Sequence, residues 1–121
     1  MAALTVPILE VASLNTATLS YGAGLVAGTI DGTDGAELTP VSKDSKYLLQ
    51  INVVTGATVT ITKGTGLQAA QANWSEALTA SRTYYLFLES GRYLHTYGTN
   101  KGKILIASNQ ADTTILAIEL P

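Results

Sequence analysis

Apolar residues occupy every second position over residues 46–63, KYLLQINVVTGATVTITK. A period of two is typical of a β-strand with one buried face, whereas an amphipathic helix needs spacings of three and four. Thr55-Gly56 separates two such runs, so we predict two strands joined as a β-hairpin, with one buried face and a threonine-covered face on the second strand. The positions predicted to be buried are Tyr47, Leu49, Ile51 and Val53 in the first run and Ala57, Val59 and Ile61 in the second.

From residue 35 onward, short runs that resemble strands alternate with turn residues. Turn residues recur at Pro40, at 64–66, at Ser90-Gly91, at 98–102 and at 109–112, a spacing typical of β-sandwiches and small barrels. We predict strands over residues 36–39, 46–54, 57–62, 73–78, 83–89, 92–96, 103–108 and 113–120. A short helix or a loop is expected at 67–73. The predicted fold is all-β, an antiparallel β-sandwich, jelly-roll-like fold or small barrel of about eight strands.

The segment TYYLFLE, residues 83–89, is apolar at consecutive positions. Strands covered on both faces read as continuous apolar runs, so we predict a central strand here. Tyr84, Tyr85 and Phe87 are then expected in the core.

Residues 1–34 differ from the rest, because glycines and other small residues dominate them. We predict an extended, Gly-rich N-terminal arm over 1–34 and a β-sandwich domain over 35–121. The first part of the arm, residues 4–11, is a candidate edge strand. Two interpretations stay open: the arm lies on a neighbouring molecule, through Leu4, Val6, Ile8 and Leu9, or it packs on its own sheet.

Composition narrows the function classes for these 121 residues, a length that suits one domain. Charged residues make up 13% and the net charge is -2, with seven scattered Lys and Arg, so we expect no nucleic-acid partner. No apolar window approaches the ~18 residues of a membrane span, and the start lacks the basic region of a signal peptide. Cysteine is absent, which excludes disulfides and thiolate chemistry. We expect a soluble product made in a cytoplasm.

Catalytic patterns are sparse. His95 is the single histidine, and no GxSxG motif supplies a serine nucleophile. Glu76 and Glu89 are expected to be solvated strand carboxylates, and the DGTDG of residues 31–35 an Asx-type turn, not a calcium loop. KGTG at 63–66 and GTNKGK at 98–103 are expected to be hairpin turns, not phosphate loops. We therefore expect no enzyme, no cofactor and no metal.

Aromatic residues offer a different kind of site. Trp74, Tyr93 and Tyr97 are candidates for an exposed aromatic face. Such a face stacks on a sugar or anchors a protein interface.

Four segments resemble small β-rich head proteins of tailed bacteriophages, the capsid decoration or cement proteins. They are DGTDGAELTPVSKDSKYLLQINV, TVTITKGTGLQ, LESGRYLHTYGTNKGKILI and ILAIELP, and the likeness runs over residues 31–121. The resemblance implies a non-enzymatic virion protein that binds the exterior of the expanded shell and bridges subunits of the major capsid protein. It also implies a homotrimer on the capsid, made in the cytoplasm of the host bacterium.

Two other functions remain open on the residues alone. One is a carbohydrate-binding or adhesin-type β-sandwich that uses the aromatic face. The other is a different virion part: a tail tube, a baseplate component or the base of a head fibre.

Overall fold

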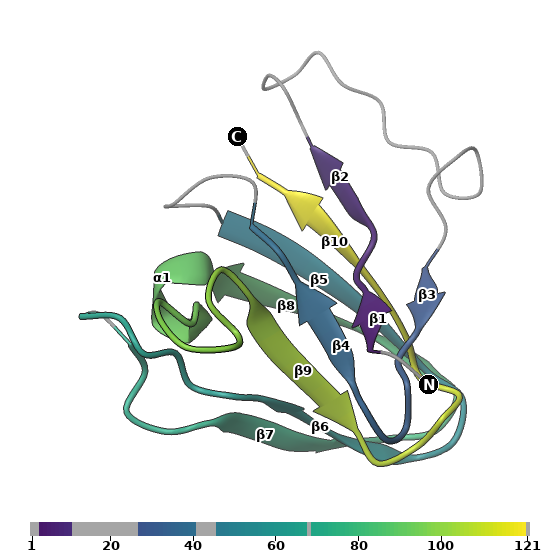
Figure 1. Cartoon of the computed structure of the whole chain (residues 1–121). Helices are drawn as coiled ribbons and strands as arrows, with labels where there is room; N and C mark the ends of the chain where they lie inside the picture. The colour runs from purple at the N-terminus through teal and green to yellow at the C-terminus, as the bar shows by residue number, and fades with distance from the viewer. Residues whose placement is uncertain (1–2, 11–26, 41–45, 68, 121) are drawn as a thin grey trace.

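Two β-sheets packed face to face form the molecule (Figure 1). The computed structural model describes residues 3–10, 27–40, 46–67 and 69–120. Sheet A has the order β1 (Leu4–Thr5), β4 (Ala36–Leu38), β9 (Ile104–Ser108), β6 (Ala57–Ile61) and β7 (Trp74–Leu78). Sheet B has the order β2 (Ile8–Glu10), β10 (Thr114–Glu119), β5 (Lys46–Val53) and β8 (Arg82–Glu89), and β3 (Gly28–Thr29) also pairs with β10. The predicted β-sandwich is confirmed, and the two sheets do not close into a barrel.

The core lies between the sheets and is built by the alternation seen in the sequence. Every residue predicted to be buried in the 46–63 segment is buried, from Tyr47 to Ile61. Sheet A adds Leu38, Ile104 and Ile106 and sheet B adds Ile115, each at most 2% exposed. Each such side chain contributes roughly 1.5–3 kcal/mol, so the facing apolar rows hold the sandwich together.

The predicted hairpin over residues 46–63 is wrong. β5 pairs with β8 and β10 in sheet B, whereas β6 pairs with β7 and β9 in sheet A. The link between them crosses from one sheet to the other, so the two buried rows face each other across the core. A tight hairpin needs a positive φ at the turn. Gly56 is not among the described residues that have a positive φ.

The predicted central position of TYYLFLE is also wrong. Among the described strands β8 pairs with β5 alone, so it is an edge strand. Leu88 is buried, and Tyr84 and Leu86 pack partly buried against the core, but Tyr85 and Phe87 are exposed. One face of the apolar run therefore packs against the core, and the other face is exposed to solvent.

The strand predicted over residues 92–96 is wrong as well. Residues 90–93 form the short helix α1 (Ser90–Tyr93), whose end is marked by the Leu94 N–H donating to the Ser90 carbonyl over 2.8 Å. The helix considered at 67–73 does not form in the described part of that segment. KGTG is not a hairpin turn, because Gly64 and Thr65 donate their N–H groups to Arg92 and Leu94 in a longer loop. Among the described helices, none is long and apolar enough to cross a membrane.

Described parts of the N-terminal segment join both sheets. β1 runs parallel to β4, β2 runs parallel to β10, and β3 runs antiparallel to β10 (Figure 1). The interruption between β1 and β2 falls at Val6-Pro7, where the chain passes from sheet A to sheet B. Residues 11–26 of the predicted arm lie outside the described residues.

Candidate functional site

The outer face of sheet B is defined by the pairing of β5 with β8. In β5 the odd-numbered residues are buried, so the even-numbered ones, Lys46 to Asn52, form the outer face. Phe87 pairs with Leu48 and Tyr85 pairs with Gln50. Because paired residues share a face, Tyr85 and Phe87 lie on the outside of the sandwich.

An apolar row crosses this outer face. Phe87 of β8 lies opposite Leu48 of β5, and Leu48 lies opposite Ile118 of β10. Leu48 and Ile118 are half-buried, and Phe87 is 76% exposed. Tyr85, in the next row, is 63% exposed. We call Leu48, Tyr85, Phe87 and Ile118 the outer patch.

β8 also has a free backbone edge. No described residue pairs with its second side, and its eight residues make it one of the two longest strands of the sandwich. Between Arg82 and Glu89 it carries six uncharged residues, TYYLFL. Long, uncharged edge strands are the ones that take up another strand.

Other edges of the sandwich are protected. β1 and β2 have two and three residues, too few for a long ladder. β7 has five, and its Glu76 pairs with the buried Val59, so this exposed carboxylate sits at an inward-facing position. An inward charge on an edge strand opposes pairing with another chain. Among the edge strands in the described part of the chain, β8 is the one that combines length with the absence of a central charge.

The candidate contact residues of the arm belong largely to the protein's own core. Val6 is 3% exposed, and Leu4 and Ile8 pack against the core. Leu9 pairs in register with Ile118 of β10. Of the two interpretations left open by the sequence, packing on the domain's own sheet describes these residues.

The candidate aromatic face is not a single flat surface. Trp74 of β7 and Tyr93 of α1 are partly buried and pack against the core. Tyr97 is 69% exposed in the loop after α1. Stacking on a sugar needs exposed ring faces, and of the three only Tyr97 is largely exposed. The sequence had placed the exposed rings of β8, Tyr85 and Phe87, in the core.

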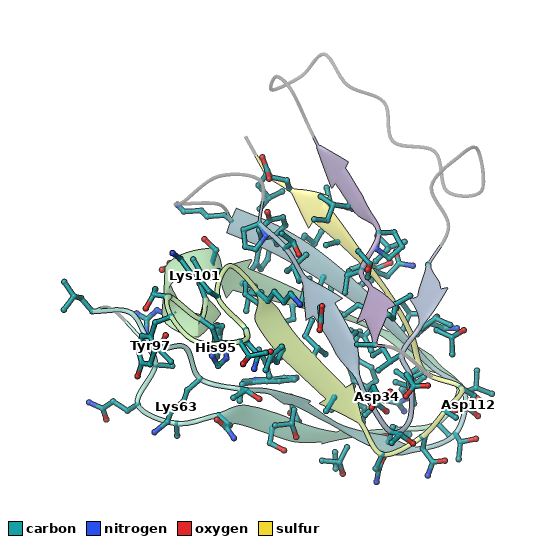
Figure 2. All side chains as sticks on the ribbon, viewed as in Figure 1. Asp34, Lys63, His95, Tyr97, Lys101 and Asp112 are labelled. Atoms are coloured by element: carbon teal, nitrogen blue, oxygen red, sulfur yellow. The ribbon has the colours of Figure 1, made fainter. Side chains whose placement is uncertain are left out.

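His95 lies near the α1 end of the sandwich, close to Tyr97 and Lys101, while Asp34 and Asp112 lie at the opposite end (Figure 2). Its Nε2 atom is buried without a hydrogen-bond partner. Its backbone is held by the Lys103 carbonyl and by the Gly102 N–H, at 3.0 and 2.8 Å. In a catalytic triad one ring nitrogen of the histidine bonds to the nucleophile and the other to an orienting group. The buried Nε2 of His95 bonds to neither kind of group.

The DGTDG segment is an Asx turn, as predicted. The Thr33 and Asp34 N–H groups donate to Oδ2 of Asp31 over 3.0 and 2.6 Å, and Gly35 closes the turn with the Asp31 backbone. These bonds, that from Asp34 foremost, hold the pKa of Asp31 below its ordinary 3.8. Within the described ranges no three His, Asp or Glu residues gather to hold a metal ion.

Neither glycine-rich loop is arranged for phosphate. The N–H groups of Gly64 and Thr65 already donate to backbone carbonyls, and Gly102 and Lys103 donate to His95 and Asn100. A phosphate loop needs N–H groups that point at the ligand. A hollow of about 420 Å³ beside the Asx turn is lined by Leu4, Thr29, Ile30, Asp31, Gly32, Thr33 and Ala111. Among the described residues that line this hollow, Asp31 is the only charged one.

The fold and this surface define a β-sandwich with an apolar outer patch beside an open edge strand. No protein-family model, curated protein or solved structure matches the chain.

Proposed function

We propose that this protein is a non-enzymatic structural component of a tailed-phage virion that binds the outer surface of the expanded capsid and stabilises it by bridging capsid subunits. The observation that carries the proposal is the outer patch: Phe87, Leu48 and Ile118 in one cross-strand row, with Tyr85 beside it. Aromatic and aliphatic side chains on a rigid sheet are anchors for protein partners. The resemblance over residues 31–121 supplies the identity of the partner.

Low charge supports the same function. Only 13% of the residues are charged, and the buried cores of protein interfaces are depleted in charged residues because charges are costly to desolvate. A single patch of this size gives weak binding. Many copies that each touch two subunits can reinforce a shell without a strong individual contact. Once a copy is bound to one subunit, its contact with the second subunit forms at a high effective concentration.

A preference for the expanded shell follows from the same geometry. A seat that spans two subunits exists only when their spacing matches the bound protein. Binding then favours the state that it fits better.

Co-sedimentation tests the proposal. The purified protein is mixed with expanded and with unexpanded shells of the phage that encodes it, and the pelleted protein is measured. We expect saturable binding to the expanded shells, near one copy per capsid subunit. Absence of binding to both shells contradicts the proposal and directs attention to tail or baseplate assembly and to glycans.

Variants locate the seat. Leu48→Thr and Ile118→Thr place β-branched polar side chains in the outer patch and keep the strand conformation. We expect each to weaken shell binding. The control is Leu67→Thr, which removes a fully exposed leucine outside the sheets and leaves binding unchanged. Equal binding by all three variants contradicts the assignment of the seat.

A further inference from the structure

The free side of β8 presents a defined set of backbone groups. The Leu120 N–H donates to the Lys46 carbonyl over 2.8 Å, and Leu120 follows β10, so even-numbered residues of β5 direct their backbone groups toward β10. Odd-numbered residues of β5 therefore bond to β8, where their partners are the even-numbered residues Arg82 to Leu88. The N–H and C=O groups of Thr83, Tyr85 and Phe87 then point to the open edge, as does the N–H of Glu89, while the Glu89 carbonyl accepts the first hydrogen bond of α1 as its N-cap.

These four residues fit an antiparallel copy of themselves. An incoming strand must pair its own free residues with them, and one register uses all four: that centred on Leu86. It places Tyr85 opposite Phe87 of the second copy and Thr83 opposite Glu89, with each pair occurring twice about a two-fold axis. Aromatic pairs across neighbouring strands are among the most stabilising in sheets.

Charge at the strand ends selects the same arrangement. Arg82 opens β8 and Glu89 closes it, with no charge between them. Antiparallel pairing brings the positive end of one strand to the negative end of the other. Parallel pairing sets like charges side by side, which is unfavourable.

We propose that β8 is a homodimerisation edge: two copies pair their β8 strands antiparallel, centred on Leu86, and join the two B sheets into one continuous sheet. Tyr85 and Phe87 of both copies then form one aromatic cluster on the shared outer face. The pair is isologous, so it closes with two copies and occupies the open β8 edge of both. This pairing is a property of the free protein and does not depend on the capsid proposal.

The size of the contact predicts a weak dimer. Tyr85 and Phe87 are 63% and 76% exposed, so with side chains of about 150–250 Å² they offer on the order of 300 Å² per copy. With the paired backbone added, the interface falls at the low end of specific contacts. We therefore expect a reversible dimer in the micromolar range.

Sedimentation equilibrium of the purified full chain, without shells, tests the proposal. The monomer has a mass of 12.6 kDa, and we expect the weight-average mass to rise toward twice that value between about 1 µM and about 1 mM. A monomer throughout this range overturns the proposal. Three copies also overturn it, because the trimer that the resemblance implies cannot form by isologous β8 pairing alone.

Variants separate this edge from other routes to association. Phe87→Lys and Tyr85→Lys each put a charge into the aromatic cluster at a position exposed in the monomer, and we expect at least ~10-fold weaker dimerisation. Leu67→Lys, the matched control, introduces the same charge in a loop and leaves the dimer intact. The double variant Tyr85→Lys/Phe87→Glu sets Lys opposite Glu twice, so we expect it to recover dimerisation. Dimerisation that is unchanged in the single variants overturns the proposal.

Cross-linking tests the register, because the chain has no cysteine of its own. Tyr85→Cys and Phe87→Cys proteins are oxidised separately and as a mixture. Opposite positions in neighbouring strands lie within disulfide range, so we expect the mixture to form a cross-linked dimer and each protein alone to form little. Efficient cross-linking of Tyr85→Cys by itself places the axis at residue 85 and overturns the Leu86 register.

Discussion

Replacing single glycines with alanine tests the fold at the level of individual contacts. Alanine can be unfavourable because the backbone φ is positive or because its Cβ meets a neighbouring atom, and four glycines differ in which of these two costs apply. Gly35 has a φ of +75°, and a Cβ there would lie 2.5 Å from the Ile106 carbonyl oxygen. Gly98 has a φ of +84° in open space. Gly64 lacks a positive φ, but its Cβ would lie 2.6 Å from the Leu94 carbonyl oxygen. Gly91 has neither feature.

The expected free energies of unfolding follow from these costs. Positive φ costs an alanine about 1–2 kcal/mol, which is the whole loss for Gly98→Ala. A clash with backbone costs about 1–3 kcal/mol, which is the loss for Gly64→Ala. Gly35→Ala carries both and loses about 2–5 kcal/mol. Gly91→Ala, in α1, gains about 0.5–1 kcal/mol, because alanine has less backbone entropy to lose.

Urea unfolding with unchanged slope m measures the four values. From most to least stable, we expect Gly91→Ala, the wild type, Gly98→Ala and Gly35→Ala. Gly64→Ala should be less stable than the wild type. If Gly35→Ala is no less stable than Gly98→Ala, the close approach of the Asx turn to β9 is refuted.

Three further predictions concern polar groups. Tyr47→Phe removes the 3.0 Å bond from the buried Tyr47 hydroxyl to Glu119 and should cost about 1–2 kcal/mol in urea unfolding. The pKa of Asp31 is lowered in the folded protein, so its carboxylate stabilises the turn fully above pH 3.8, and this stabilisation is lost as the pH falls through the lower folded pKa. An NMR titration that gives the Asp31 carboxyl a pKa of 3.8 or higher contradicts this prediction. Ser108→Ala should cost more alone than in the background of Thr113→Val, because the single variant leaves one buried hydroxyl of a 3.0 Å pair without its partner; additive losses argue against the pair.

Local alternation predicted which residues of β5 and β6 are buried but not how the strands pair. A strand with one buried face has the same pattern in a hairpin and in a link between two facing sheets. The choice depends on β8, β9 and β10, which supply the actual neighbours from far along the chain. Thr55-Gly56 looked like a hairpin turn, yet a β-branched residue disfavours the positive φ that tight hairpins need.

The exposed rings of β8 were missed for a related reason. Continuous apolar character is expected of a strand buried on both faces, and it is equally expected of an edge strand whose outer face is apolar and exposed. One signal was available: Arg82 and Glu89 bracket the run, whereas a fully covered central strand seldom ends in two charges. At residues 92–96, packing of Tyr93 and Leu94 on the core outweighs strand propensity and favours α1.

The N-terminal segment illustrates the limit of composition. Small residues and glycines predicted an arm, but Val6 is placed between the sheets by the parallel pairing of β1 with β4. The bond from the Val6 N–H to the Glu37 carbonyl, 2.9 Å long, fixes that register. No local pattern contains this information, because the paired residues Leu4 and Ala36 are 32 positions apart in the sequence.

Reinforcement of the shell is the central claim, and heads that lack the protein test it most directly. DNA-filled heads are heated with and without added purified protein, and the temperature of DNA release is measured. We expect added protein to raise that temperature, and Leu48→Thr to raise it less. Bound protein that leaves the release temperature unchanged contradicts the claim.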